Sequence, residues 1–168
     1  MSIYAELLSI KQFREGKAAT EVSRARGAVV RHHRDADSAR AALQAWREEA
    51  AARERAWYAD LCARIVRLRD IEAVQRGVAG LRATEREREE AERAALRQLE
   101  AARAALASAQ HTHAEALRMR DKFAELAEQY AGELAAEAER REDLEMEEAA
   151  SVARDREEFD EWEQRDHD

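Results

Sequence analysis

The residues that could do chemistry are few and are poorly spaced for it. The single cysteine is Cys62, and the five histidines are His32, His33, His111, His113 and His167. Residues one or two positions apart on a helix point in different directions, so neither close pair of histidines makes a two-ligand metal face. A lone cysteine completes neither a zinc site nor an intramolecular disulfide bond. The sequence therefore predicts no bound metal ion and no cofactor.

Other catalytic patterns are missing as well. The pair Gly77 and Gly80 lacks the length and the lysine-serine ending of a phosphate-binding loop. The H-E-x-x-H pattern of zinc hydrolases does not occur either. We therefore expect that the protein is not an enzyme and that it acts through its surface.

Composition favours long helices over a globular core. The 168 residues include 39 alanines, 26 arginines and 27 glutamates, and no proline. Such a composition, combined with helical periodicity, is typical of coiled coils and long helices. Alanine buries little area, so a deep and dry pocket is not expected.

Charge and hydropathy exclude several classes of partner. The net charge is −8, which disfavours binding to nucleic acid. No stretch approaches the ~18 consecutive apolar residues of a membrane span, so membrane insertion is not expected. The first residues lack a basic segment followed by an apolar run, which is the pattern of a cleavable signal peptide. We expect a cytoplasmic protein.

Apolar residues recur at alternating steps of three and four, which is the pattern of a coiled-coil seam. In the first half they are Val22, Ala25, Val29, Ala36, Ala39, Leu43, Trp46, Ala50 and Trp57, with polar exceptions at His32 and Arg53. In the second half they are Leu99, Ala102, Leu106, Ala109, His113 and Ala116, then Met119, Phe123, Leu126, Tyr130 and Leu134 after a shift of phase. Between the halves, the changed steps of Leu61, Ile65 and Leu68 predict a stutter in the seam.

The two glycines near the middle predict a turn. A glycine costs ~1 kcal/mol relative to alanine inside a helix, and Gly77 and Gly80 lie three residues apart. The sequence thus predicts a single all-α domain over residues 1–168, a long antiparallel two-helix coiled-coil hairpin that forms a rod. Its helices would cover about 3–75 and about 82–162, with the turn at about 76–81. One unbroken helix is the alternative.

The position of this turn decides which residues should face each other. Trp57 should meet Leu99, and Gly27 should lie opposite Tyr130. The second helix should then extend past the N-terminus by roughly ten residues, and this short overhang should include Phe159 and Trp162, covered by another protein or else frayed.

Two regions hold more apolar residues than a two-helix seam needs, and exposed apolar patches commonly bind partners. The candidate partner-binding residues at the turn end are Ile65, Leu68, Ile71, Val74, Arg76, Val78 and Leu81. Those at the open end, where the two termini should meet, are Ile3, Leu7, Lys11, Arg14, Phe159 and Trp162. An alternative is that the extra apolar residues at the turn end only repair the stutter.

Three runs of sequence carry a family resemblance. They are Leu7-Leu8-Ser9-Ile10-Lys11-Gln12-Phe13-Arg14-Glu15, Lys122-Phe123-Ala124-Glu125-Leu126 and Glu139-Arg140-Arg141-Glu142-Asp143-Leu144-Glu145-Met146-Glu147-Glu148. With its length, its two long charged helices, its mid-chain turn and its lack of proline, essentially the full chain resembles the YscO/SctO proteins of bacterial type III secretion systems, which are relatives of flagellar FliJ.

The resemblance implies a cytoplasmic stalk that lies in the central pore of the hexameric secretion ATPase and reaches toward the cytoplasmic ring of the export gate. It also implies that the protein promotes ATPase assembly and turnover and escorts chaperones of secreted translocators. By the same analogy, the open end would enter the ATPase and the turn end would face the export gate. A monomer or weak oligomer is expected.

Two alternatives remain open. The chain could be a self-associating structural coiled coil without an ATPase partner, which would form a stable dimer or trimer. It could also be a flagellar FliJ proper. An elongated monomer that raises ATPase turnover would distinguish the stalk from the structural coiled coil.

Overall fold

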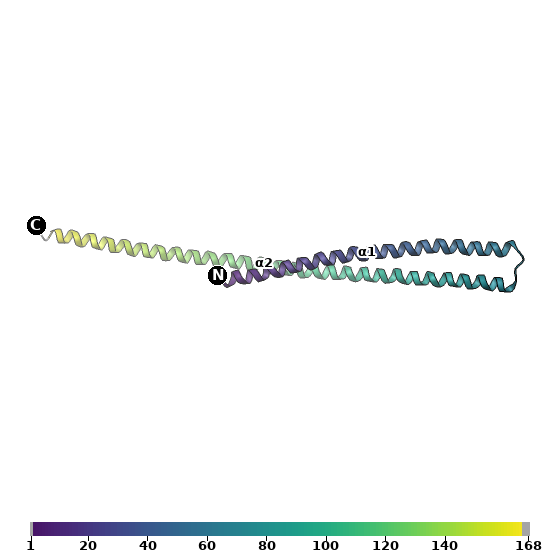
Figure 1. Cartoon of the computed structure of the whole chain (residues 1–168). Coiled ribbons are helices and arrows are strands. Elements are labelled where there is room, and N and C mark those ends of the chain that lie inside the picture. Colours follow the sequence, from purple (N-terminus) through teal and green to yellow (C-terminus); the bar gives the residue numbers. More distant parts are fainter. Residues whose placement is uncertain (1, 166–168) are drawn as a thin grey trace. The chain divides into compact units, whose positions relative to one another are not determined.

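A computed structural model describes residues 2–165 and contains two helices among them. Helix α1 spans Ile3–Ala63 and helix α2 spans Leu68–Arg165 (Figure 1). The chain divides into two compact units: the tip unit is Gly16–Glu115, and the terminal unit is the described part of Met1–Glu15 and Ala116–Asp168. In each unit α1 lies antiparallel beside α2. The predicted fold class, an all-α antiparallel two-helix coiled-coil hairpin, is therefore confirmed.

Both helices begin with a cap that a side chain provides. At α1 the hydroxyl of Ser2 accepts a hydrogen bond from the backbone N–H of Ala5 at 3.3 Å. At α2 the carboxylate of Asp70 accepts a hydrogen bond from the N–H of Arg67 at 2.9 Å, which is one half of a capping box. Such caps satisfy N–H groups that the first helical turn leaves without partners. The high content of alanine, arginine and glutamate then favours continuation of each helix.

The core of the tip unit is a narrow seam between the two helices. Its buried residues are Val22, Ala36, Leu43, Ala50, Leu81, Leu99 and Ala102. The four on α1 are separated by multiples of seven residues, so they share one heptad position. The polar seam residues His32 and His113 are half-buried, whereas Arg53 is exposed. The seam pattern predicted for this unit is therefore confirmed, except at Arg53.

The turn does not lie at the glycines, so the predicted turn at 76–81 and the predicted helix bounds are wrong. Residues 64–67 connect the helices, and Gly77 and Gly80 lie inside α2. No described residue other than glycine has a positive φ, and no described glycine has one, so the connection does not require glycine. The β-branched pair Ile65 and Val66 disfavours continuation of α1, and Asp70 caps the start of α2. The changed apolar steps that predicted a stutter mark this connection instead.

Gly77 is explained by a close approach and not by a turn. Atom Cζ3 of Trp57 lies 2.9 Å from the position that a Cβ at Gly77 would occupy, so the indole uses the space of the missing side chain. Trp57 therefore faces Gly77, and the predicted pairing of Trp57 with Leu99 is wrong. Gly80 has no such constraint, because no atom lies within 4 Å of its Cβ position.

Alanine substitutions at these two glycines are expected to have opposite effects on stability. Gly80→Ala should raise the melting temperature by ~3 °C, since it gains ~1 kcal/mol of helix propensity and meets no obstacle. Gly77→Ala should lower the melting temperature, because its Cβ would collide with the indole of Trp57. Thermal melts followed by circular dichroism measure the difference. In a Trp57→Ala background Gly77→Ala should become stabilising, and equal rises in the wild-type background would contradict the Trp57 contact.

In the terminal unit, α1 begins beside the middle of α2. The ring centroids of Tyr4 and Tyr130 lie 5.2 Å apart, so Tyr130 faces Tyr4 and not Gly27 as predicted. Past Tyr130, α2 continues with no second helix of the described chain beside it (Figure 1). The predicted short overhang is therefore wrong. Its physical cause is the early turn, which shortens α1 and lengthens α2.

Candidate interaction surfaces

The side chains that could bind a metal are spread along the helix surfaces. His33 Nδ1 lies 3.1 Å from a carboxylate oxygen of Asp37, and His111 Nε2 lies 3.2 Å from one of Glu115. Residues 2–165 contain no group of three or more His, Cys, Asp or Glu side chains that could hold a metal ion, and His167 lies outside them. Neither helix, as far as it is described, is long and apolar enough to cross a membrane. The surfaces where the chain could contact other proteins are therefore the features to examine.

The connection between the helices exposes an apolar surface among arginines. Ile65 is fully exposed, Leu68 is 71% exposed and Ile71 is 38% exposed. Arg64 donates two hydrogen bonds to Asp60, at 3.1 and 3.0 Å, and these raise the pKa of its guanidinium. We define the tip surface as Arg64, Ile65, Arg67, Leu68, Arg69 and Ile71.

The other four residues predicted at the turn end are not part of this surface. Val74 and Val78 are half-buried, and Leu81 is buried in the seam. Only Arg76 is exposed. Leu81 is thus a core residue, because the true turn lies well before it and places it inside the hairpin.

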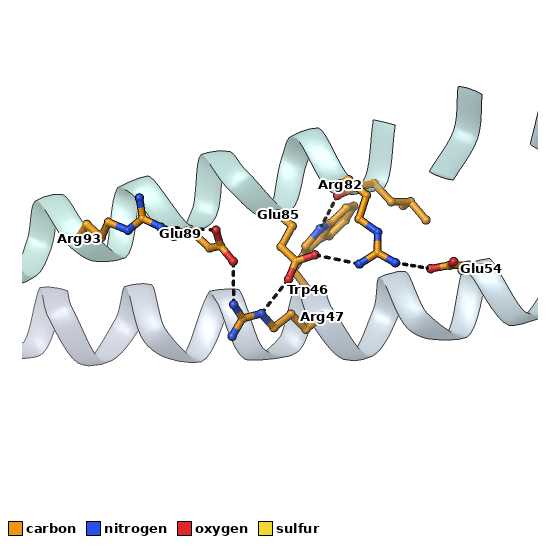
Figure 2. Close-up of polar contacts among 8 residues, drawn as sticks. Trp46, Arg47, Glu54, Arg82, Glu85, Glu89 and Arg93 are labelled. Atoms are coloured by element: carbon orange, nitrogen blue, oxygen red, sulfur yellow. Dashed lines mark hydrogen bonds and ion pairs between the residues drawn. The ribbon is translucent and has the colours of Figure 1, made fainter. Parts of the chain in front are cut away.

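Arginines and glutamates join the two helices along one side of the tip unit (Figure 2). Arg47 on α1 donates hydrogen bonds to Glu85 at 2.9 Å and to Glu89 at 2.8 Å, and these raise the pKa of its guanidinium. Arg82 on α2 reaches back to Glu54 at 3.2 Å. Solvent screens these exposed pairs, so they add little to stability. They do favour one alignment of the helices over neighbouring ones, because each arginine needs its glutamates at the matching turn.

Trp46 makes both polar and aromatic contacts in the tip unit. Its indole Nε1 donates a hydrogen bond to the carbonyl oxygen of Leu81 at 3.3 Å (Figure 2). The guanidinium of Arg88 lies 5.2 Å from its ring centroid, and that of Arg53 lies 5.7 Å away, so both make cation–π contacts. Arg88 was missed in the sequence, although it lies seven residues after Leu81 and therefore at a seam position.

Where α1 lies beside α2 in the terminal unit, charged side chains reach across to the other helix. Lys11 Nζ lies 5.1 Å from the ring centroid of Phe123, and Glu15 lies 3.6 Å from Arg120 across the helices. Three other residues predicted at the open end differ in exposure, since Leu7 is half-buried whereas Ile3 and Arg14 are exposed. In this part of the chain, Lys11 and Glu15 of α1 contact Phe123 and Arg120 of α2.

Phe159 and Trp162 do not join the N-terminal residues as the predicted open end required. Phe159 lies roughly 45 Å beyond Tyr130 along α2, at ~1.5 Å per residue. The ring centroids of Phe159 and Trp162 are 6.4 Å apart, and each residue is 60% exposed. The predicted open end therefore separates into a paired part and a single-helix part. No sequence signal reveals this division unless the turn is placed correctly, because the turn decides where α1 ends along α2.

Comparison with known proteins gives a consistent result. The family model for type III secretion protein YscO matches residues 4–152. The crystal structure of type III secretion protein YscO from Vibrio parahaemolyticus is similar, with a TM-score of 0.82 and 25% sequence identity, over 87% of this chain and 92% of that chain. Comparison with curated protein sequences finds no match. Phe159 and Trp162 lie beyond the residues that the family model matches.

Proposed function

The chain belongs to the YscO family of type III secretion proteins, and we propose on this basis that it is the central stalk between the hexameric secretion ATPase and the export gate. Membership alone makes it a component of the type III secretion apparatus. As a stalk it would promote ATPase assembly and turnover on the cytoplasmic side and would escort chaperones of secreted translocators.

Two exposed surfaces of different character, one on each unit, support this role. The tip surface combines aliphatic residues with three arginines. Residues 131–162 of the terminal unit carry 13 acidic and four basic residues. A protein that joins two different partners needs two chemically dissimilar surfaces, since complementary charge selects each partner.

We assign the tip surface to the cytoplasmic ring of the export gate and the terminal unit to the ATPase. The tip surface suits a partner with an apolar patch and carboxylates at its edge, because it presents Ile65 and Leu68 among arginines. In the terminal unit, the exposed Ile3 and Arg14 lie on the paired part, and Trp162 lies on the single-helix part.

Ile65→Asp combined with Leu68→Asp should weaken binding to the purified cytoplasmic domain of the export gate at least tenfold, or ~1.4 kcal/mol. The two aspartates remove apolar contact area and place negative charge beside Arg67 and Arg69. Because both residues are exposed, helicity should not change, and stimulation of ATP hydrolysis by the ATPase should persist. Calorimetric titration measures gate binding, and a phosphate-release assay measures ATPase turnover.

Val30→Asp is the matched control, because Val30 is 49% exposed in the same unit but lies far from the tip surface along α1. It should leave gate binding unchanged. Loss of binding in Val30→Asp as well would mean that any added negative charge weakens the complex. A wild-type chain that neither binds the ATPase nor raises its turnover, and that sediments as a stable dimer, would reject the stalk and favour the self-associating coiled coil.

A further inference from the structure

Residues 131–162 of α2, here called the acidic extension, have no part of α1 beside them. All of them except the half-buried Ala136 are exposed, and their 13 acidic and four basic residues give a net charge of −9. The large apolar residues among them are also exposed: Leu134, Leu144, Met146, Val152, Phe159 and Trp162. Most helices gain their stability by packing an apolar face against another element. The acidic extension therefore needs a partner outside the hairpin to bury these side chains.

A second copy of the chain is a poor partner for the acidic extension. Leu134 and Trp162 share one heptad position, and the residues between them at this position are Arg141, Glu148 and Asp155. In a parallel pair of copies each of these charges would face its own like charge across the seam. In either direction, two helices of charge −9 would repel each other. The charge pattern favours a basic partner instead.

The end of the acidic extension carries two aromatic residues on one face. Phe159 and Trp162 are three positions apart, and their rings are tilted by 37° at a centroid distance of 6.4 Å. Glu157 and Glu158 directly precede Phe159. Large apolar residues at this spacing are typical of a helix that binds in a groove, and nearby carboxylates complement lysine and arginine at the edge of that groove.

We propose that the acidic extension docks as a single helix into an apolar groove that is edged by lysine and arginine on the secretion ATPase. Phe159 and Trp162 fill the groove, and the carboxylates along the helix meet its basic edge. This docking rests on the proposed function and specifies the chemistry of its ATPase contact. The acidic charge accelerates encounter, whereas the aromatic residues slow release.

Binding kinetics of the full-length chain on immobilised hexameric ATPase test this docking. Phe159→Ala with Trp162→Ala should raise the dissociation rate at least tenfold and leave the association rate nearly unchanged. Glu157→Gln with Glu158→Gln should lower the association rate and reduce its dependence on salt concentration. Tyr58→Ala is the matched control, because it removes an aromatic residue that is 47% exposed on α1 of the tip unit, outside the unit assigned to the ATPase. It should change neither rate.

The outcomes separate this docking from the stalk function itself. If the wild-type chain raises ATPase turnover and the double aromatic variant dissociates no faster, the docking is wrong and the stalk function stands. Equal acceleration of dissociation by Tyr58→Ala would show that the effect is not specific to the acidic extension and would also overturn the docking. If the wild-type chain does not bind the ATPase, both are rejected. Sedimentation that shows a dimer, which the double aromatic variant converts to a monomer, would identify a second copy as the occupant and overturn the docking.

Discussion

Leu99→Asp is expected to lower the free energy of unfolding by about 4 kcal/mol, which is a large part of the stability of a typical domain. Leu99 is buried in the seam of the tip unit, and none of the buried residues there is polar or charged. A carboxylate at this position would lose its hydration without gaining a partner, and the removed side chain would leave a cavity. Urea unfolding followed by circular dichroism measures the loss.

Leu144→Asp is the control for this substitution. Leu144 is a leucine on the same helix, but it lies in the acidic extension and is exposed. The same change there should alter the free energy of unfolding by less than ~0.5 kcal/mol. Similar losses in the two variants would mean that burial does not explain the effect, and a negligible loss in Leu99→Asp would contradict the position of the seam.

Trp46→Ala should cost about 3 kcal/mol of unfolding free energy. The substitution removes a half-buried indole, its hydrogen bond to the carbonyl of Leu81 and its cation–π contacts with Arg88 and Arg53. It also leaves Arg88, whose buried Nε has no hydrogen-bond partner in the described structure, without the aromatic ring that faces it. The melting temperature and the urea midpoint should both fall.

Two further variants separate the contribution of the indole N–H of Trp46 from that of its ring and its burial. Trp46→Phe keeps an aromatic ring but removes the indole N–H, so it should lose only about 1 kcal/mol. Trp162→Ala removes the same side chain from an exposed position and should change unfolding by less than ~0.5 kcal/mol. A large loss in Trp162→Ala would show that the acidic extension packs against the chain itself.

The fold class was predictable because two strong signals agree. Composition favours helix at almost every position, and the steps from Val22 to Trp57 place one narrow apolar stripe on α1. A stripe of this width can be buried only against another helix, so an antiparallel pair follows once the chain turns. Burial in the structure matches these positions.

The place of the turn was not predictable by the same rules. Helix-breaking residues usually mark a turn, and Gly77 is the obvious candidate in a chain without proline. In the structure, Gly77 leaves space for the indole of Trp57. Only the correct pairing of the two helices brings these residues together. The actual connection is marked by weaker signals, namely the β-branched Ile65 and the carboxylate of Asp70.

Errors in the candidate surfaces follow from this one misplacement. Ile65 and Leu68 were predicted as exposed residues of the first helix and are exposed, but the reason is that they lie in and directly after the connection at 64–67. Leu81 was assigned to the surface and is buried. Phe159 was expected on a short overhang just past the N-terminus, but the early turn makes the part of α2 beyond α1 much longer and places Phe159 near its far end.

The four-residue connection also determines the order in which the hairpin closes. Contacts near it, such as Trp57 with Gly77, enclose short loops and cost little chain entropy. The contact of Tyr4 with Tyr130 encloses most of the chain and costs the most. We therefore expect the hairpin to close from the connection toward the termini, and thermal fraying to start at the contact of Tyr4 with Tyr130. A partner that binds the terminal unit would hold the two helices together at the end that separates first. Its binding free energy would therefore add to the stability of the closed hairpin.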